Sequence, residues 1–292
     1  MKVLIWIALI AGYGSCFAQK RVDRDKDKLQ AKEHISKQIT LQQGAANTVF
    51  SLYNVFGNIK VEGYNGNQIQ IEIDQTIIAD DAEQMELAKK EFKLGFDQKA
   101  DSVIAYTAAP YDSRPHRWDR NHNNDERRHY HVKLEYTVKV PNNININVAT
   151  VNDGNVDVKD VYGTLKVNNV NGAIAIENAK NTTDARTING NLIVSYLTNP
   201  TQPSTYYTLN GKLEVTYQTN TAANLQFKSM NGQFYTDFEN TEILPTQVVK
   251  TETKKDNSTT YKLNKNTQIK VGTGGKLFKF ETLNGNIYIK KA

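Results

Sequence analysis

The chain of 292 residues is long enough to bury a sizeable core in one or two domains. Its moderately polar composition, rich in Asn, Thr, Val and Ile, favours strands and turns over helices. The formal charge of +5 is too small and too scattered to indicate a nucleic-acid-binding protein, so no nucleic-acid partner is expected.

Residues 1–18 predict a signal peptide. Lys2 supplies the basic start, residues 3–11 form a short apolar run, and Cys16 and Ala18 form a small-x-small site, with cleavage after Ala18. The apolar run is shorter than the roughly 20 residues that span a bilayer, so we expect no membrane span in the mature chain. We therefore predict export to the periplasm, the outer surface or the medium.

Cys16 leaves one alternative open, because an acylated cysteine would make the chain a lipoprotein. The residues before Cys16 lack the branched aliphatic residue that is usual three positions upstream, which favours cleavage after Ala18. Cys16 is the only cysteine, so the mature chain would have no disulfide, no thiol nucleophile and no cysteine metal site.

The mature chain is predicted to begin with a charged linker and to continue as one domain. Residues 19–33 alternate in charge with almost no apolar side chain, which is typical of a solvated linker. Residues 34–292 are predicted to form a single domain, with strands that begin near Ile35.

One helix is expected, over residues 80–95. Asp80 and Asp81 supply N-cap oxygens, and Gly95 fits a C-terminal cap. An apolar stripe at three- and four-residue steps contains Met85, Ala88, Phe92 and Phe96. We expect this helix to pack on the strands and to cover an end or edge of a sheet.

Residues 110–131 break the strand pattern with two prolines and a polar run, which predicts a long loop inserted in the domain. His129 and His131 have the spacing of one side of a strand, and with His122 they are candidate ligands for zinc or copper. The alternative is a solvated loop without metal, which we favour because a metal site needs ligands that converge in space.

The same loop carries a basic patch with aromatic side chains. Its candidate ligand-binding residues are Arg114, Arg117, Trp118, Arg120, Arg127, Arg128 and Tyr130. Guanidinium groups bind anions through paired hydrogen bonds, and an aromatic ring stacks on a sugar face or a cation. The patch would suit an acidic polysaccharide or a lipopolysaccharide phosphate, and the alternative is a solvated surface loop.

Residues 151–194 carry a nine-residue repeat. The repeated positions are Gly154, Gly163, Gly172 and Gly190, with Asn181 in the missing place. Most copies read apolar, Asn or similar, Gly, any residue, apolar, any residue, apolar. Gly and Asn tolerate a positive φ, so each copy predicts a corner followed by a short strand with alternate side chains inward.

Two copies of the repeat would make one circuit of the chain, and a short fixed period indicates a right-handed parallel β-helix-like stack, a β-solenoid. Related phrases at Gly57, Gly211, Gly232 and Gly285 extend the pattern to both ends, with a hairpin near residues 254–258. The predicted fold class is all-β with one short capping helix. The alternative is a β-sandwich in which Asn-Gly pairs form hairpin turns.

No catalytic constellation stands out. The chain lacks the G-x-S-x-G, H-E-x-x-H and G-x-x-x-x-G-K motifs, and the acidic residues of the repeat are spread singly over different copies. We expect no catalytic residues, no cofactor and no enzymatic activity. A polysaccharide-active β-helix enzyme is the remaining alternative.

The repeated phrase behind a signal peptide resembles the bacterial "putative adhesin" family of the head GIN type, a family of unknown function. The likeness is carried by residues 140–143, 188–190, 209–211 and 283–285, and it covers residues 35–292 except for the His-rich loop. It implies a β-solenoid-like fold and carries over no catalytic residue.

Together these observations predict an exported, adhesin-like protein of the cell envelope. It would bind an envelope or extracellular glycan or protein through its surface loops or its solenoid face. The alternative is a structural or regulatory envelope protein that contacts other proteins through its edge strands or its loop.

Overall fold

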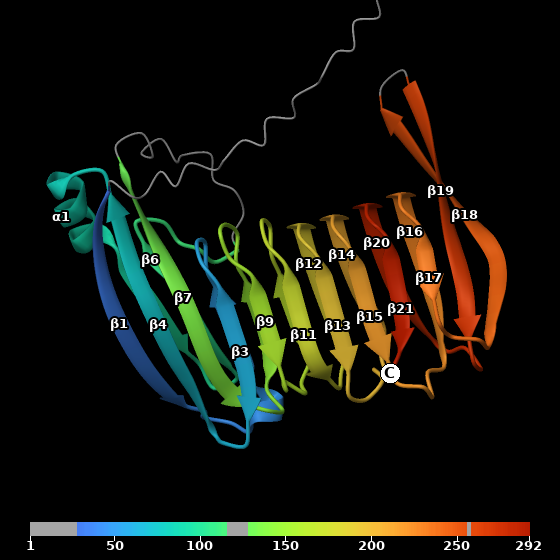
Figure 1. The fold of residues 1–292 in the computed structure, drawn as a ribbon, viewed down its shortest axis with the longest axis horizontal. Helices are drawn as coiled ribbons and strands as arrows, with labels where there is room; N and C mark the ends of the chain where they lie inside the picture. The colour runs from blue at the N-terminus through green and yellow to red at the C-terminus, as the bar shows by residue number, and fades with distance from the viewer. Residues whose placement is uncertain (1–27, 116–127, 256–257) are drawn as a thin grey trace, which may run out of the picture.

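The computed structural model describes residues 28–115, 128–255 and 258–292, and it describes side chains outside residues 246–266. The described chain is all-β with one α-helix, and its strands form two large mixed sheets that face each other across the core (Figure 1). This two-layer layout fits the β-sandwich alternative. No helix in the described ranges has the length and apolar character needed to cross a bilayer.

Each sheet is continuous from one end of the molecule to the other. The ten-stranded sheet runs in the order β1 (Leu29–Thr40), β4 (Gln68–Ala79), β7 (Tyr130–Pro141), β3 (Ile59–Tyr64), β9 (Val156–Lys159), β11 (Ile174–Ala179), β13 (Leu192–Tyr196), β15 (Leu213–Tyr217), β21 (Ile287–Lys291) and β17 (Phe234–Thr236). The eleven-stranded sheet runs in the order β18 (Thr241–Lys255), β19 (Ser258–Val271), β16 (Ala223–Asn231), β20 (Lys276–Asn284), β14 (Ser204–Asn210), β12 (Thr183–Asn189), β10 (Leu165–Asn168), β8 (Asn145–Ala149), β2 (Val49–Tyr53), β6 (Ser102–Ala109) and β5 (Lys93–Gln98).

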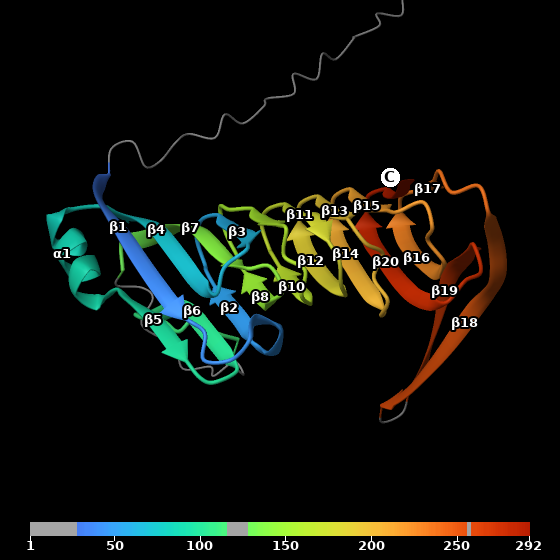
Figure 2. The same cartoon turned by 90° about the horizontal axis from the view of Figure 1, so that it is seen from below.

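In the middle of the molecule, successive strands alternate between the two sheets and pair in parallel within each sheet (Figures 1 and 2). Val156 of β9 lies beside Ile174 of β11, two copies of the repeat further along the chain. Between β13 and β15 the offset is longer, with Leu192 beside Leu213. The repeated Asn-Gly pairs therefore join strands of different sheets, and they are not the hairpin turns that the sandwich alternative assumed.

Alternate side chains of the repeat point into the space between the sheets. Ile174 and Ile176 of β11 are buried, while Ala175 between them lies on the outer face and is half-buried. Leu192 and Val194 of β13 repeat the pattern one circuit later. Burial of one such side chain contributes about 1.5–3 kcal/mol, so the predicted inward alternation supplies the core.

The glycines of the repeat are required by contact between circuits, not by backbone conformation. Gly154, Gly172 and Gly190 do not have a positive φ, so the expectation of left-handed corners at these residues is wrong. A Cβ on Gly172 would lie closer than 3.0 Å to the carbonyl oxygen of Gly154, and a Cβ on Gly190 would meet Gly172 in the same way. The stack runs in the order Gly57, Gly154, Gly172, Gly190, Gly211, Gly285 and Gly232.

Asparagines one or two residues before the stacked glycines, from Gly154 onward, form a ladder of their own. The Asn171 Nδ2 donates to Asn152 Oδ1 at 2.8 Å, and the Asn189 Nδ2 donates to Asn171 Oδ1 at 2.9 Å. The ladder continues through Asn210, Asn284 and Asn231. Each amide thus joins its own circuit to the neighbouring one at the corner where the glycines touch.

Three tyrosines share a polar cluster inside the apolar core. The Tyr206 hydroxyl lies 2.6 Å from the Tyr196 hydroxyl and 3.1 Å from the Tyr217 hydroxyl, and all three side chains are buried. Burial raises the pKa of each hydroxyl above its usual range. The cluster satisfies hydroxyls that would otherwise be costly to bury.

The C-terminal strand pair lies inside the stack. β20 and β21 lie between β14 and β15 on one side and β16 and β17 on the other. Gly232 therefore packs on Gly285, and Gly285 packs on Gly211. As the sequence predicted, a corner leads from β20 into β21, and Lys255 of β18 pairs antiparallel with Ser258 of β19 at the place of the expected hairpin. The sequence did not predict that the last circuit would separate Gly211 from Gly232.

The helix is shorter than predicted. α1 (Ala82–Glu91) begins after Asp81, whose Oδ1 accepts a hydrogen bond from the Gln84 backbone N–H at 2.8 Å. Phe92 is already extended, and β5 takes up the following residues by pairing with β6. Gly95 is thus not a helix cap, because it lies in β5, where a Cβ would meet the Tyr106 ring. α1 packs against β4, β1 and β7 at the end of the ten-stranded sheet, as expected (Figure 1).

The predicted linker is also too long. β1 begins at Leu29, where it pairs antiparallel with Ala79 of β4, so part of the range 19–33 belongs to a strand. β1 is an edge strand and most of its side chains are exposed. An edge strand needs backbone pairing on one side and few apolar side chains, so its charged sequence did not indicate a strand.

The glycine stack predicts a position-specific cost for one methyl group. Gly172→Ala should lower the free energy of unfolding by about 1–3 kcal/mol, because the new Cβ would overlap a backbone carbonyl that packing holds in place. Gly44→Ala is the matched control. A Cβ added at Gly44 would have no atom within 4 Å, and the φ of Gly44 is −59°, which alanine adopts without strain. We expect this substitution to change stability by no more than about 0.5–1 kcal/mol. Equal losses in chemical denaturation would contradict the stacking argument.

A pH-dependent pair of hydrogen bonds, here called the clamp, joins His34 of the edge strand β1 to two carboxylates of β4. On the outer face, His34 of β1 lies 2.7 Å from the Asp74 carboxylate and 2.9 Å from Glu72, both on β4. These hydrogen bonds, chiefly that to Asp74, raise the pKa of His34 above 6.5. The contribution of the clamp to stability is therefore present below the unfolded pKa and is lost as pH rises through the folded pKa.

Asp74→Asn should lower the pKa of His34, as followed by NMR titration of its ring resonances. It should also reduce the pH dependence of amide-exchange protection in β1 above neutrality. A His34 pKa that does not respond to this substitution would rule the clamp out.

Candidate ligand-binding surface

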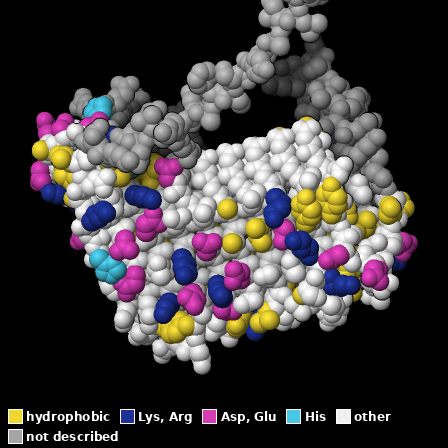
Figure 3. All heavy atoms as spheres, in the orientation of Figure 1, with side chains coloured by type: hydrophobic (Ala, Val, Ile, Leu, Met, Phe, Trp, Pro, Cys, Tyr) yellow, Lys and Arg dark blue, Asp and Glu magenta, His cyan; other side chains and the backbone are white. Residues whose placement is uncertain are grey.

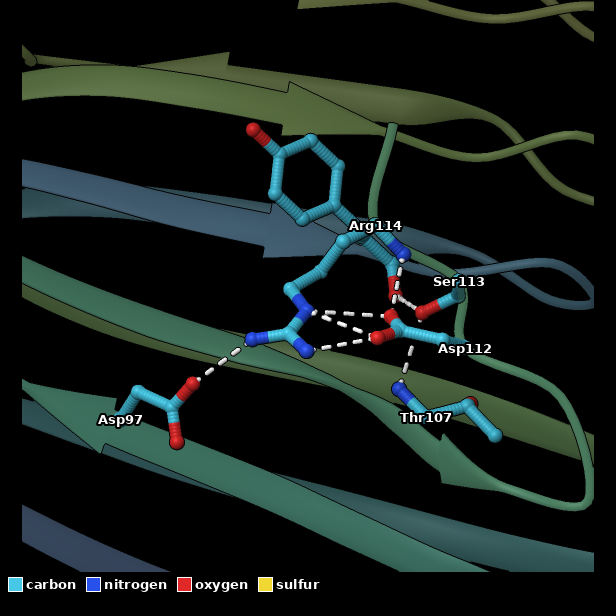
Figure 4. A network of polar contacts seen from close by, with 6 residues as sticks. Asp97, Thr107, Asp112, Ser113 and Arg114 are labelled. Carbon is cyan, nitrogen blue, oxygen red and sulfur yellow. Dashed lines mark hydrogen bonds and ion pairs between the residues drawn. The ribbon is translucent and has the colours of Figure 1, made fainter. Parts of the chain in front are cut away.

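The N-terminal end of the His- and Arg-rich segment, residues 110–131, is fixed by the hydrogen bonds of Arg114 (Figure 4). The Arg114 guanidinium donates to Asp112 through Nε at 3.0 Å and Nη2 at 2.6 Å, and through Nη1 to Asp97 of β5 at 2.8 Å. The same guanidinium lies 3.9 Å from the centre of the Tyr106 ring. A paired guanidinium that also packs on an aromatic ring holds its loop to the sheet.

Ser113 adds a second attachment beside this network. Its hydroxyl donates to the Tyr53 carbonyl at 2.8 Å and accepts from the Thr107 backbone N–H at 2.9 Å (Figure 4). The Ser113 backbone N–H donates to the Thr107 carbonyl at 3.0 Å. The chain after β6 is thus bound to β2 and β6.

The other end of the segment is fixed to α1. The Glu91 carboxylate accepts from Arg128 Nε at 3.0 Å and from the Tyr130 hydroxyl at 2.9 Å. The hydrogen bond from Arg128 lowers the pKa of Glu91, while burial and then the bond to Glu91 raise the pKa of Tyr130 to about 12. Tyr130 begins β7, so the predicted loop 110–131 is two residues too long.

The candidate metal ligands do not come together in the part of the chain that the structure describes. His129 Nδ1 lies 3.7 Å from the Asp80 carboxylate, and His131 of β7 packs against the Phe56 ring at 5.8 Å. Residues 28–115, 128–255 and 258–292 contain no group of three or more His, Cys, Asp or Glu side chains placed to hold a metal ion. His122 lies outside the described residues.

The ligand-binding candidates divide in the same way. Arg114, Arg128 and Tyr130 are described, and both arginines are paired with carboxylates. Arg117, Trp118, Arg120 and Arg127 lie outside the described residues.

The outer face of the ten-stranded sheet mixes charges of both signs (Figure 3). Glu214 is held between Lys212 at 2.9 Å and Lys290 at 2.8 Å. At the C-terminal end of this face, Tyr235 and Tyr288 stack at 5.0 Å with an angle of 9°. The ion pairs account for Glu214 without a catalytic role.

The outer face of the eleven-stranded sheet contains a hollow of about 260 Å³ over β12, β14, β20 and β16. We call it the cationic hollow, and its polar lining includes Arg186, Tyr207, Gln226, Lys228, Lys279 and Glu281. The sequence did not predict this hollow. These residues are distant in the chain, and β20 places Glu281 between Tyr207 and Lys228 and Lys279 between Thr205 and Gln226. The sequence indicated only that each of these residues takes an outward position in a strand whose side chains alternate between inward and outward.

Comparisons with known proteins give structural likeness alone. No protein-family model matches the chain, and no curated protein sequence matches it. Among solved structures, the chain is similar to a "putative cell adhesion protein" from Clostridium sporogenes, with 12% identity and a TM-score of 0.46 over 90% of this chain and 100% of the other. It is also similar to a "putative adhesin" from Bacteroides fragilis, with 11% identity and a TM-score of 0.38 over 90% and 98%. A "putative lipid binding protein" from Parabacteroides distasonis has 9% identity and a TM-score of 0.30 over 89% and 96%.

The attachment at α1 predicts a measurable tyrosine titration. Glu91→Gln should lower the pKa of Tyr130 from about 12 toward 10, because the phenolate would no longer face a carboxylate while burial still disfavours it. Arg128→Gln should not lower it, since the guanidinium favours the phenolate. The ¹³Cζ resonance of Tyr130 reports both values. A fall of equal size in both variants would mean that the Glu91 contact does not set this pKa.

Proposed function

We propose that this protein is an exported, adhesin-like binding module of the cell envelope that acts through surface contacts and not through catalysis. In this proposal residues 1–18 are a signal peptide and residues 34–292 form a single domain. The parallel pairing of β9 with β11 and of β13 with β15 supports a β-solenoid, in which each circuit contributes one strand to each sheet. The resemblance noted in the sequence supports the adhesin-like role.

The attachment of the His- and Arg-rich segment at both ends carries this proposal. Arg114 ties one end to β5 and β6, and Arg128 ties the other to α1, all at the same end of the molecule. The described residues on either side of the range 116–127 are thereby fixed to the sheets and to α1. Binding residues are commonly carried by loops that a rigid scaffold positions.

This geometry divides the candidate residues by role. Arg114 and Arg128 serve as attachments, because carboxylates already occupy their guanidinium groups. Arg117, Trp118, Arg120 and Arg127 are the proposed contacts to a glycan or lipopolysaccharide phosphate, on the strength of their chemistry in the sequence.

Open strand edges support a second candidate function, that of an envelope protein which contacts other proteins. Among the described strands, β1 and β18 each pair on one side only, and β1 is 12 residues long. An edge strand presents unpaired backbone groups to which a strand of a partner can add.

A binding screen separates the two functions. The mature protein and a variant with Arg117, Trp118, Arg120 and Arg127 replaced by Ser are applied to immobilised glycans, envelope polysaccharides and lipopolysaccharide. Loss of binding in the variant, at unchanged melting temperature, is the expected result. As a control, Lys166→Ser and Lys139→Ser change exposed charged residues on the two outer faces, outside the loop.

Binding that survives the four substitutions would remove the loop as the contact. No binding by the folded wild-type protein, together with recovery of an envelope protein by cross-linking at β1, would favour the second function.

A further inference from the structure

The cationic hollow lines up side chains that the sequence scatters along the chain from Arg186 to Glu281. Parallel pairing places Arg186 beside Tyr207, Tyr207 beside Glu281, and Glu281 beside Lys228. A second row, one step along the strands, places Lys279 between two residues, Thr205 and Gln226. Neighbouring strands are about 4.8 Å apart, so the four strands present a straight track of roughly 14 Å.

Several donors in this track have no partner in the described protein. Arg186 uses its Nε for Asp184 at 2.9 Å, and neither of its Nη atoms bonds to a described side chain. Within the same described ranges, the Lys279 ammonium forms no ion pair and the Tyr207 hydroxyl forms no hydrogen bond. A guanidinium with its outer edge open can bind a carboxylate, sulfate or phosphate through two parallel hydrogen bonds.

The charges of the lining favour an anion. Three cations, Arg186, Lys228 and Lys279, face the hollow, and Glu281 is its one lining carboxylate. Glu281 is already paired with Lys228. Arg186 is paired with Asp184, so the positive charge without a described partner is that of Lys279, and the open Nη edge of Arg186 adds donors on the other side of Tyr207.

We propose that the cationic hollow binds a linear anionic polysaccharide, which lies across β12, β14, β20 and β16. Acidic groups of successive sugars pair with Arg186 and Lys279, and a sugar face stacks on Tyr207. The site rests on the proposed surface-binding function and adds to it a ligand class and a contact that does not involve residues 110–131.

A straight chain fits this surface better than a compact anion does. The donors are spread over four neighbouring strands in two adjacent rows, whereas a single phosphate would need them to converge on one point.

The test measures binding of the mature protein to polygalacturonate, heparin, neutral amylose and poly-L-glutamate at two salt concentrations. We expect binding to the acidic polysaccharides that weakens with salt, and little binding to amylose. Arg186→Gln and Lys279→Gln should each weaken it about tenfold, the loss of one charge-assisted contact. Lys139→Gln removes the same charge from an exposed site on the opposite sheet and should have no effect.

Glu281→Gln should tighten binding of the acidic polysaccharides several-fold, because it removes the one carboxylate from the lining of the hollow. A destabilised protein would not give this result. Poly-L-glutamate separates charge from sugar recognition. Binding to it as strong as to polygalacturonate, or Tyr207→Ala without effect, would overturn the polysaccharide assignment.

Outcomes for the hollow and for the proposed function are distinguishable. If the acidic polysaccharides bind but only the loop substitutions weaken that binding, the assignment of the hollow as the site is wrong and the surface-binding function stands. If no acidic polysaccharide binds while another glycan of the broader screen does, the hollow is again wrong. If nothing in either screen binds, both fail.

Discussion

The close packing of glycine on glycine at one corner of every circuit is the constraint on which the structure depends. Gly172 lies so near the Gly154 carbonyl that no side chain fits between them, and the same contact recurs from Gly57 to Gly232. Thr187 and Thr208 donate their hydroxyls to the Gly172 and Gly190 carbonyls at 2.8 Å, so these carbonyls remain satisfied. The stack sets the register of the parallel strands, and that register aligns buried apolar residues inside and polar residues outside.

The regular register also explains what the outer faces can do. In a parallel sheet, residues of equal position form rows at the strand spacing, so a few outward side chains on neighbouring strands become a continuous surface. On the ten-stranded sheet the rows largely pair opposite charges, as Glu214 does with two lysines. On the eleven-stranded sheet, Lys279 of β20 forms no ion pair with a described side chain, and Arg186 pairs with Asp184 through Nε alone.

The two ends of the molecule depart from the repeat, and sequence reasoning was least accurate there. The helix boundary moved because residues after Glu91 pair with β6, a contact that helix propensity does not contain. The first residues of β1, up to position 33, fell within the predicted linker, because an edge strand needs little apolar sequence. Among the ligand candidates, Arg114 and Arg128 were recognised as charged loop residues, but their carboxylate partners, Asp97 and Glu91, lie in other elements.

The sequence by itself determined the all-β class, the spacing of the corners and the inward side chains, because these follow from local periodicity and from the residues that a corner tolerates. The reason for the glycines was decided by the tertiary structure, since steric contact between circuits leaves the same mark in a sequence as a positive φ. The tertiary structure also decided where the last circuit lies. The phrases at Gly211, Gly232 and Gly285 are nearly interchangeable, and only the packing of β20 and β21 between strands that precede them in the chain orders them in space and creates the cationic hollow.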